Sequence, residues 1–70
     1  MKAGDCIKYW RTELKLSQQK LAEMIGSNQQ AISRWEANVN VPNINDCFKI
    51  ARALQLSLDE IFGDLDLYFG

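Results

Sequence analysis

The sequence predicts an all-α fold, a compact domain of five short helices. Apolar residues recur every three or four positions along most of the chain, the spacing of helices that bury one face. Serine or asparagine stands where four of these helices would begin, in three cases with an acidic or amide residue three positions later. The 70 residues are 47% apolar and 24% charged, a composition typical of one globular domain.

The first helix is expected over residues 5–14. Ile7, Trp10 and Leu14 would form its buried stripe. Asp5 stands at its start, where a carboxylate interacts favourably with the positive end of the helix dipole.

The second helix is expected to begin after Ser17, a favourable N-cap, and to end at Gly26. Leu21, Ala22 and Ile25 form its apolar face, and the small Ala22 allows another helix to cross closely. Gly26 stands where the backbone requires a positive φ, which glycine adopts without steric cost. These features predict a tight turn between two helices.

A third helix is expected after a Ser27 cap, with Ile32 and Trp35 on its buried face and an end near residues 37–38. Its opposite, exposed face carries Gln29, Gln30, Ser33 and Arg34. In a DNA major groove, glutamine can form two hydrogen bonds to adenine and arginine two to guanine, so the pattern is typical of a helix-turn-helix. Two other interpretations stay open. Gln30 could complete a capping box with Ser27, and polar helix faces often serve only solubility.

The second half of the chain predicts a loop and two more helices. Residues 38–42 are expected to be a loop, because a short Val-Asn-Val alternation is followed by Pro42. A fourth helix begins after the Asn43 cap, and its apolar surface is supplied by Ile44, Cys47, Phe48, Ile50, Ala51 and Leu54. Ser57 and Glu60 form another capping box, which opens a short fifth helix that Gly63 ends.

The residue types expected at catalytic and metal sites are scarce. The chain has no histidine, and its two cysteines, Cys6 and Cys47, are far apart in sequence, which excludes the usual zinc motifs. Cys47 is expected to pack as a small apolar side chain and Cys6 to be half exposed, with a disulfide between them as the alternative. No carboxylate pair or activated nucleophile stands out. We therefore expect no catalysis, cofactor, metal or small-molecule ligand.

Charge is unevenly distributed along a chain whose net charge is −1. Residues 1–36 carry six basic and four acidic side chains, whereas residues 37–70 carry two basic and five acidic ones. The half that contains the two central helices is thus the one suited to contact phosphate. No apolar run approaches the roughly 18 residues of a membrane span and no leader is visible, so a cytoplasmic location is expected.

By its motifs and the order of its elements, the chain resembles the lambdoid phage repressor and Cro-like (XRE-type) family of DNA-binding proteins. The resemblance covers residues 7–63. Its most specific segments are Leu16-Ser17-Gln18, Leu21-Ala22, Ile25-Gly26, Ile32-Ser33-Arg34-Trp35-Glu36 and, after Pro42, residues 50–61. The resemblance implies a repressor-like domain with its helix-turn-helix at the second and third helices.

The resemblance also implies roles for individual residues. Gln29, Gln30 and Arg34 would face base edges, and Ser33, on the same surface near the DNA backbone, is assigned to base reading with them. The residues expected to contact phosphate are Gln18, Ser17, Asn28, Lys15 and Asn40. Arg11 would pair with Glu36, and two independent surface charges are the alternative.

The chain departs from the family pattern in two places that would touch DNA. Residues 38–41 lack the glycine and basic residues that often bind phosphate in this loop, which leaves backbone N–H groups and asparagine side chains to do so. Lys15 stands where glycine is common. It is expected to be mildly strained and able to reach a phosphate.

Residues 1–63 are expected to form the DNA-binding domain and residues 64–70 an apolar tail that extends a dimer interface. A domain this small makes few contacts, so two copies on half-sites about 34 Å apart would supply the missing affinity. The expected interface residues are Leu58, Ile61, Phe62, Leu65, Leu67 and Phe69. Alternatively, the tail folds back on the first and fifth helices or is disordered.

The sequence therefore predicts a transcriptional regulator, by default a repressor, that binds specific double-stranded DNA as a homodimer. The competing hypothesis is a protein-interaction module with the same fold, such as an antitoxin or accessory subunit. It is favoured by the acidic, apolar C-terminal third and by the absence of charge from residues 38–42. An enzyme is not expected.

Overall fold

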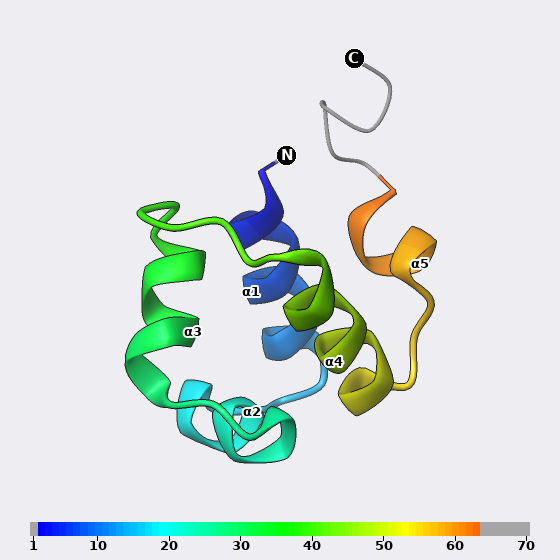
Figure 1. Cartoon of the computed structure of the whole chain (residues 1–70). Helices are drawn as coiled ribbons and strands as arrows, with labels where there is room; N and C mark the ends of the chain where they lie inside the picture. Colours follow the sequence, from blue (N-terminus) through cyan, green and yellow to red (C-terminus); the bar gives the residue numbers. More distant parts are fainter. Residues whose placement is uncertain (1, 64–70) are drawn as a thin grey trace.

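The computed structural model describes residues 2–63, and this part of the chain forms five helices and no strand (Figure 1). The helices are α1 (Ala3–Glu13), α2 (Gln18–Ile25), α3 (Gln29–Glu36), α4 (Ile44–Leu54) and α5 (Leu58–Phe62). The predicted all-α class is confirmed, with α2 and α3 as the two helices joined by a tight turn.

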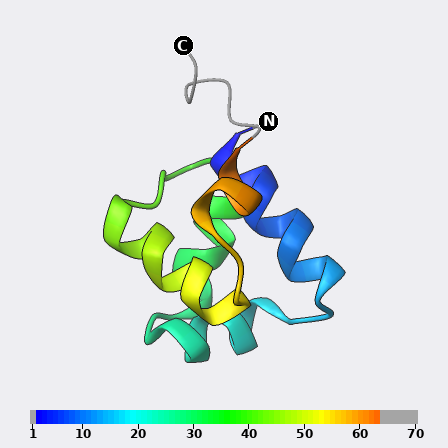
Figure 2. The same ribbon diagram turned by 90° about the vertical axis from the view of Figure 1, so that its right-hand side faces the viewer.

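The arrangement of the helices leaves α3 at one side of the molecule. α1 contacts both α3 and α5, and these two helices lie on opposite sides of the domain (Figures 1 and 2). α2 packs against α3 and α4. Because α3 is supported by α1 and α2 and not by α5, any ligand that approaches its outer face meets no obstruction from the C-terminal helix.

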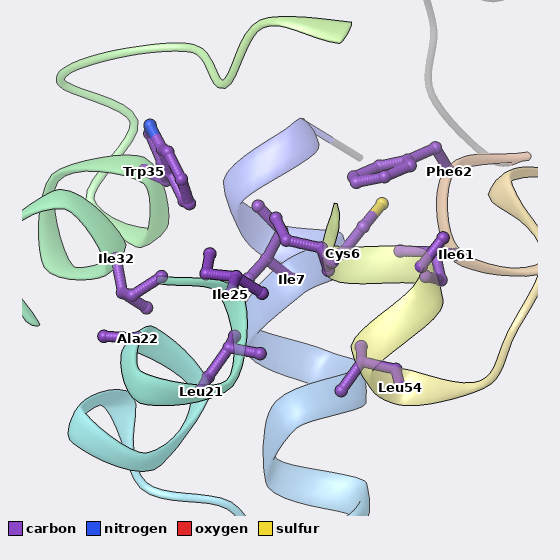
Figure 3. Packing of buried hydrophobic residues seen from close by; sticks show 12 residues of the cluster. Cys6, Ile7, Leu21, Ala22, Ile25, Ile32, Trp35, Leu54, Ile61 and Phe62 are labelled. Atoms are coloured by element: carbon purple, nitrogen blue, oxygen red, sulfur yellow. The ribbon is translucent and has the colours of Figure 1, made fainter. Parts of the chain in front are cut away.

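The core is one cluster of apolar side chains to which all five helices contribute (Figure 3). Ile7, Leu21, Ile32 and Ile50 are fully inaccessible to solvent. Burial of each such side chain stabilises the folded state by about 1.5–3 kcal/mol. The core thereby holds the inner faces of α1, α2, α3 and α4 together.

α5 closes this core on the side away from α3. Ile61 and Phe62 are only 2% and 4% exposed, and both point toward Cys6 and Ile7 of α1 (Figure 3). These two side chains seal the protein's own core and so supply no exposed apolar surface for a dimer, contrary to expectation. Leu58 packs against the core and is half-buried. Leu65, Leu67 and Phe69, together with the rest of the predicted tail, lie outside the described residues.

Three predicted N-caps are present. The side chains of Ser17, Asn43 and Ser57 each accept a hydrogen bond from the backbone N–H three residues later, at 2.8–3.0 Å. Asn43 and Ser57 also form the predicted capping boxes. The starts of α2, α4 and α5 therefore follow directly from local sequence.

α1 begins two residues earlier than predicted. Asp5 is its third residue, and the Oδ2 atom accepts a hydrogen bond from the backbone N–H of Lys2 at 3.1 Å. This bond, and a second one donated by the Asn38 side chain, lower the pKa of Asp5 below its ordinary value. The carboxylate thus caps the helix from within its first turn instead of marking its first residue.

α3 begins after Asn28, which corrects the predicted Ser27 cap. Asn28 Oδ1 accepts a hydrogen bond from the backbone N–H of Ala31 at 2.9 Å. Asparagine caps helices as well as serine does, so the start moves by one residue. The capping box of Ser27 with Gln30 does not form, and Gln30 has no capping role.

Several apolar side chains predicted to be buried are exposed. Leu14 is 44% exposed, because α1 ends at Glu13 and Leu14 only follows it as the C-cap. Ile44 and Phe48 are 62% and 52% exposed, since their spacing of four residues places both on the face of α4 that turns away from the core. The buried residues of α4 are Ile50, Ala51 and Leu54.

The two cysteines are separated in the fold, and no disulfide joins them. Cys6 is 2% exposed, not half exposed as predicted, because it lies on the face of α1 that meets α5. Cys47 is half-buried against the core, and this burial raises the pKa of its thiol. Both side chains act as small apolar groups.

Left-handed backbone occurs at four positions of residues 2–63, of which Gly26 and Asn38 suit it best. The φ angle is 69° at Gly26, 61° at Asn38 and 60° at Lys15. Asparagine tolerates this region better than most residues, whereas at Lys15 the Cβ atom costs about 1 kcal/mol or more. Gln55, at the end of α4, has a φ of 57° that the sequence does not predict.

Candidate nucleic-acid interface

The outer face of α3 is polar and open to solvent. Gln29, Gln30, Ser33 and Arg34 are all exposed, and together they line one open hollow on the surface. Ile32 and Trp35 hold the opposite face of the helix in the core. The structure therefore places all four residues predicted to read bases on one accessible surface of a firmly anchored helix.

Three of these side chains have no hydrogen-bond partner in residues 2–63. Gln30 makes no capping bond, and neither Ser33 nor Arg34 contacts a polar group of another described residue through its side chain. Their donors and acceptors are directed to solvent. Such groups can bond to base edges or phosphates without first breaking an interaction within the domain.

Gln29 differs from its neighbours because its side chain is attached to α2. Its Nε2 atom donates to Oε1 of Gln18 at 3.4 Å. Gln18 Nε2 in turn donates to Oε1 of Glu36 at 3.1 Å. A continuous line of hydrogen bonds therefore runs from the outer face of α3, across the first turn of α2, to the last residue of α3.

Glu36 is held at the inner end of this line by Arg11 of α1. Nε and Nη2 of Arg11 donate to the two carboxylate oxygens at 2.6 and 2.9 Å, and Nη1 donates to the carbonyl of Leu16 at 2.7 Å. The side chains are only 12% and 4% exposed, and the hydrogen bonds to Glu36 raise the pKa of Arg11. The Arg11–Glu36 pair is the one that the family resemblance implies. Together with the bond to Leu16, it joins α1, α3 and the turn before α2.

Four of the five residues predicted to contact phosphate, Lys15, Ser17, Gln18 and Asn28, lie at or just before the starts of α2 and α3. Ser17 and Asn28 cap these two helices, so their side-chain oxygens already accept backbone hydrogen bonds. Lys15 and Asn40 are exposed, the first in the turn before α2 and the second in the loop after α3. Helix N-termini favour anions, so this arrangement suits a phosphate backbone.

Gly4 is the residue that sequence reasoning missed. It is buried where α1 crosses α3, and a Cβ atom there would lie 1.8 Å from the carbonyl oxygen of Trp35. No side chain fits at this crossing, so α1 and α3 touch backbone to backbone. The only signal in the sequence is a glycine close to the start of a helix, where glycine is otherwise unfavourable.

Other kinds of site were sought in residues 2–63. No group of three or more histidine, cysteine, aspartate or glutamate side chains in this range is placed to hold a metal ion. No helix there is both long and apolar enough to cross a membrane.

A helix with an exposed polar face, joined to the preceding helix by a tight turn, is the defining feature of helix-turn-helix proteins. Residues 7–61 match the family described as Helix-turn-helix. The chain belongs to this family, in its phage-repressor-like (XRE-type) branch, as the sequence motifs predicted.

Two curated relatives are regulators longer than this chain. The repressor protein C2 of Salmonella phage P22 is 38% identical over 63 residues, which cover 89% of this chain and 29% of the relative. The HTH-type transcriptional regulator DicA of Escherichia coli (strain K12) is 34% identical over 64 residues, which cover 90% of this chain and 47% of the relative. The chain thus spans less than half the length of either relative.

Two solved structures of the P22 repressor are closely similar to this domain. The solution structure of its DNA-binding domain superposes with a TM-score of 0.84 at 36% identity, covering 94% of this chain and 88% of that one. Its crystal structure in complex with a synthetic operator gives a TM-score of 0.79 at 34% identity, covering 87% and 92%.

Proposed function

We propose that this chain binds specific double-stranded DNA, reads the major groove with α3 and regulates transcription, by default as a repressor. The observation that carries the proposal is the outer face of α3, where four exposed polar side chains line one hollow. Major-groove edges of base pairs present the donors and acceptors that glutamine and arginine match. The similar P22 repressor has a structure in complex with operator DNA, which supports the proposal. Such a regulator would act in the cytoplasm.

Base reading is assigned to Gln29, Gln30, Arg34 and Ser33. Contact with phosphate is assigned to Gln18, Ser17, Asn28, Lys15 and Asn40. The division follows position, since the first group lines the hollow on α3 and the second lies at helix starts and in loops. Phosphate contacts would fix the position of the domain, and base contacts would select the sequence.

The proposed active form is a homodimer. One domain presents a single eight-residue helix to the groove, and two copies on half-sites one helical turn apart would supply the affinity and symmetry that one copy lacks. α5 lies opposite α3, so an interface that includes Leu58 of α5 would leave the DNA face open. Residues 64–70 are assigned to the same interface as part of this proposal. Sedimentation of the full chain and of a chain ending at Gly63 tests this assignment. Equal self-association of both chains would contradict it.

Selection of bound sequences from a random DNA pool tests the function directly. The expected result is one enriched motif with two-fold symmetry and half-sites about 34 Å apart. Asn40→Ala should weaken binding to all sequences alike, because a phosphate contact carries no sequence information. A chain that shifts no DNA at low salt and enriches no motif would contradict the proposal.

That negative outcome would favour a protein-interaction module. The observation on its side is a group of exposed apolar side chains, Val39, Val41, Ile44 and Phe48, which are 52–79% exposed. Isolated apolar side chains are normal on protein surfaces, whereas a group in one segment is unusual. The DNA shift experiment therefore separates the two functions.

A further inference from the structure

We infer that Asp5, at the start of α1, positions the loop of residues 37–43 for contact with a DNA phosphate, with Asn38 as the intermediary. This role rests on the proposed function and adds two positioning residues to it, because neither Asp5 nor Asn38 is assigned a contact with DNA. The contribution of Asn40 to DNA binding should consequently depend on both of them.

The loop after α3 has no charged side chain with which to attract phosphate, since residues 38–42 are all uncharged. A lysine is a mobile point charge that attracts phosphate from a range of positions, whereas an asparagine amide must lie about 3 Å from the phosphate oxygen to donate to it. Binding through this loop therefore depends on how exactly its short donors are placed.

Most backbone N–H groups of the loop are already used within the domain. The N–H of Asn38 donates to the carbonyl oxygen of Trp35 at 3.0 Å. The next two N–H groups, of Val39 and Asn40, donate to the carbonyl oxygen of Arg34 at 2.9 and 3.4 Å. The side chain of Asn40 is exposed and bonds to nothing in the part of the chain that the structure describes, so its amide is available to a phosphate.

Asn38, where the loop leaves α3, is held by α1. Its Nδ2 atom donates to Oδ1 of Asp5 at 3.3 Å, and the start of α1 lies beside the loop (Figures 1 and 2). Oδ2 of Asp5 accepts the backbone N–H of Lys2 at 3.1 Å, so the carboxylate is itself fixed to the first turn of its helix. These two bonds lower the pKa of Asp5 and keep it an ionised acceptor at neutral pH.

Gly4 fixes the orientation of the same amide. A Cβ atom on Gly4 would lie 2.7 Å from Oδ1 of Asn38, so the amide oxygen rests against the backbone of α1 in space that a side chain would fill. The Nδ2 atom then faces Asp5, whose carboxylate accepts hydrogen bonds and donates none. Both polar atoms of the Asn38 side chain are thus placed by α1.

A purely local role is the alternative for both residues. Asn38 has a φ of 61°, which asparagine tolerates, and Asp5 caps α1. Glycine adopts the same φ without strain, so Asn38→Gly keeps the backbone and removes only the link to Asp5. With a local role alone this substitution would leave DNA binding unchanged, whereas loss of a positioning role weakens it.

The experiment is a double-mutant cycle of Asn38→Gly with Asn40→Ala, in which the affinity of the full chain is measured for its selected DNA and for random-sequence DNA. We expect Asn38→Gly to weaken binding to both DNAs about two- to tenfold, the range for the loss of one hydrogen bond, with the selected motif unchanged. Asn40→Ala should lose most of its effect in the Asn38→Gly background, because the loop no longer places Asn40 at the phosphate.

Asp5→Ala tests the same link from α1. Removal of a negative charge by itself strengthens DNA binding, so the effect of Asp5→Ala is compared between the wild-type and Asn38→Gly backgrounds, in which the charge effect is the same. We expect Asp5→Ala to be less favourable for binding in the wild-type background than in the Asn38→Gly background, by about the same two- to tenfold.

Gln55→Gly is the matched control. Gln55 also has a positive φ, of 57°, and is exposed at the end of α4, with no side-chain bond in residues 2–63. Its replacement should leave DNA binding as in the wild type. Thermal melts show that each variant is folded at the temperature of the binding measurement.

Two kinds of outcome would overturn the inference, and they are distinguishable. Wild-type affinity in Asn38→Gly, or losses from Asn38→Gly and Asn40→Ala that simply add, would leave the proposed function intact and assign Asp5 and Asn38 to local structure alone. A wild-type chain that binds no DNA would reject the proposed function, and the inference with it.

Discussion

Arg34 and Glu36 are two residues apart on α3, yet their surroundings are opposite: one side chain is exposed and the other is buried in an ion pair. Glu36 is enclosed by Arg11 and Gln18, with 4% of its side chain exposed. Arg34 is exposed and has no side-chain partner in residues 2–63. Removing one partner of a buried ion pair leaves an uncompensated charge in the domain, whereas charged groups directed to solvent cost little to change and are available to a ligand. Substitutions on the inner face should therefore affect folding, and those on the outer face binding.

The largest expected effect is the loss of the Arg11–Glu36 pair. Glu36→Ala leaves Arg11 buried without its counter-charge and should lower the free energy of unfolding by about 3–5 kcal/mol. Changing both residues, for example to Glu36→Ala with Arg11→Met, should cost less than the two single changes together. Urea denaturation of the four proteins measures this, and additive losses would show that the two side chains do not interact.

The second-largest loss of stability is expected from a substitution at Gly4, where the backbones of α1 and α3 are in contact. Gly4→Ala places a methyl group against the Trp35 carbonyl, where an ideal Cβ would lie 1.8 Å from the oxygen, and should destabilise by about 1–3 kcal/mol. Helix propensity alone predicts the opposite sign, a gain of about 1 kcal/mol. Lys8→Ala, on an exposed position of α1, is the control and should change stability by less than about 0.5 kcal/mol. A Gly4→Ala variant as stable as the wild type would contradict the close crossing.

The helix caps and the Gly4 contact show which parts of the fold can be predicted from the sequence and which cannot. The caps at Ser17, Asn43 and Ser57 were predictable because each depends on residues three positions apart. The role of Gly4 was not, since it depends on Trp35, which is distant in sequence and meets Gly4 only after α1 and α3 have packed.

For the candidate site, the sequence predicts which side chains of α3 are exposed but not how they are linked to the other helices. The exposed face of α3 follows from its 3.6-residue period, which fixes the direction of each side chain. The link from Gln29 through Gln18 to Glu36 joins three separate turns of helix, so no local pattern reveals it. Exposure of Phe48 was missed for the same reason, because an apolar residue on a helix does not itself show which face meets the core.

On the outer face, Arg34→Ala should affect binding and leave the fold intact. The affinity for the preferred DNA should fall by about 1–3 kcal/mol, with relaxed preference at one base position in each half-site. The free energy of unfolding should change by less than about 0.5 kcal/mol. Arg52→Ala, another exposed arginine but on α4, is the matched control and should bind as the wild type does. An unchanged motif after Arg34→Ala would remove α3 as the reading helix.

The smallest expected effect is at Lys15, where one substitution should raise the stability of the domain and lower its affinity for DNA. Lys15→Gly relieves a φ of 60° and should stabilise the domain by about 1 kcal/mol. If Lys15 contacts phosphate, the same change should weaken binding to all DNA sequences and reduce the slope of log affinity against log salt by about one. Thermal melts and a salt titration measure the two effects. Binding that is unaffected at every salt concentration would exclude Lys15 from the interface.

The lack of internal partners at Gln30, Ser33 and Arg34 has a consequence for how this domain can diversify. Substitutions at these three positions sacrifice no bond within residues 2–63, so a lineage or a designer can change them freely while the scaffold stays folded. Gln29 is less permissive, since any replacement also disturbs Gln18. New specificities should therefore arise first at the three unattached positions, and a change at Gln29 should be accompanied by a compensating change at Gln18 or Glu36.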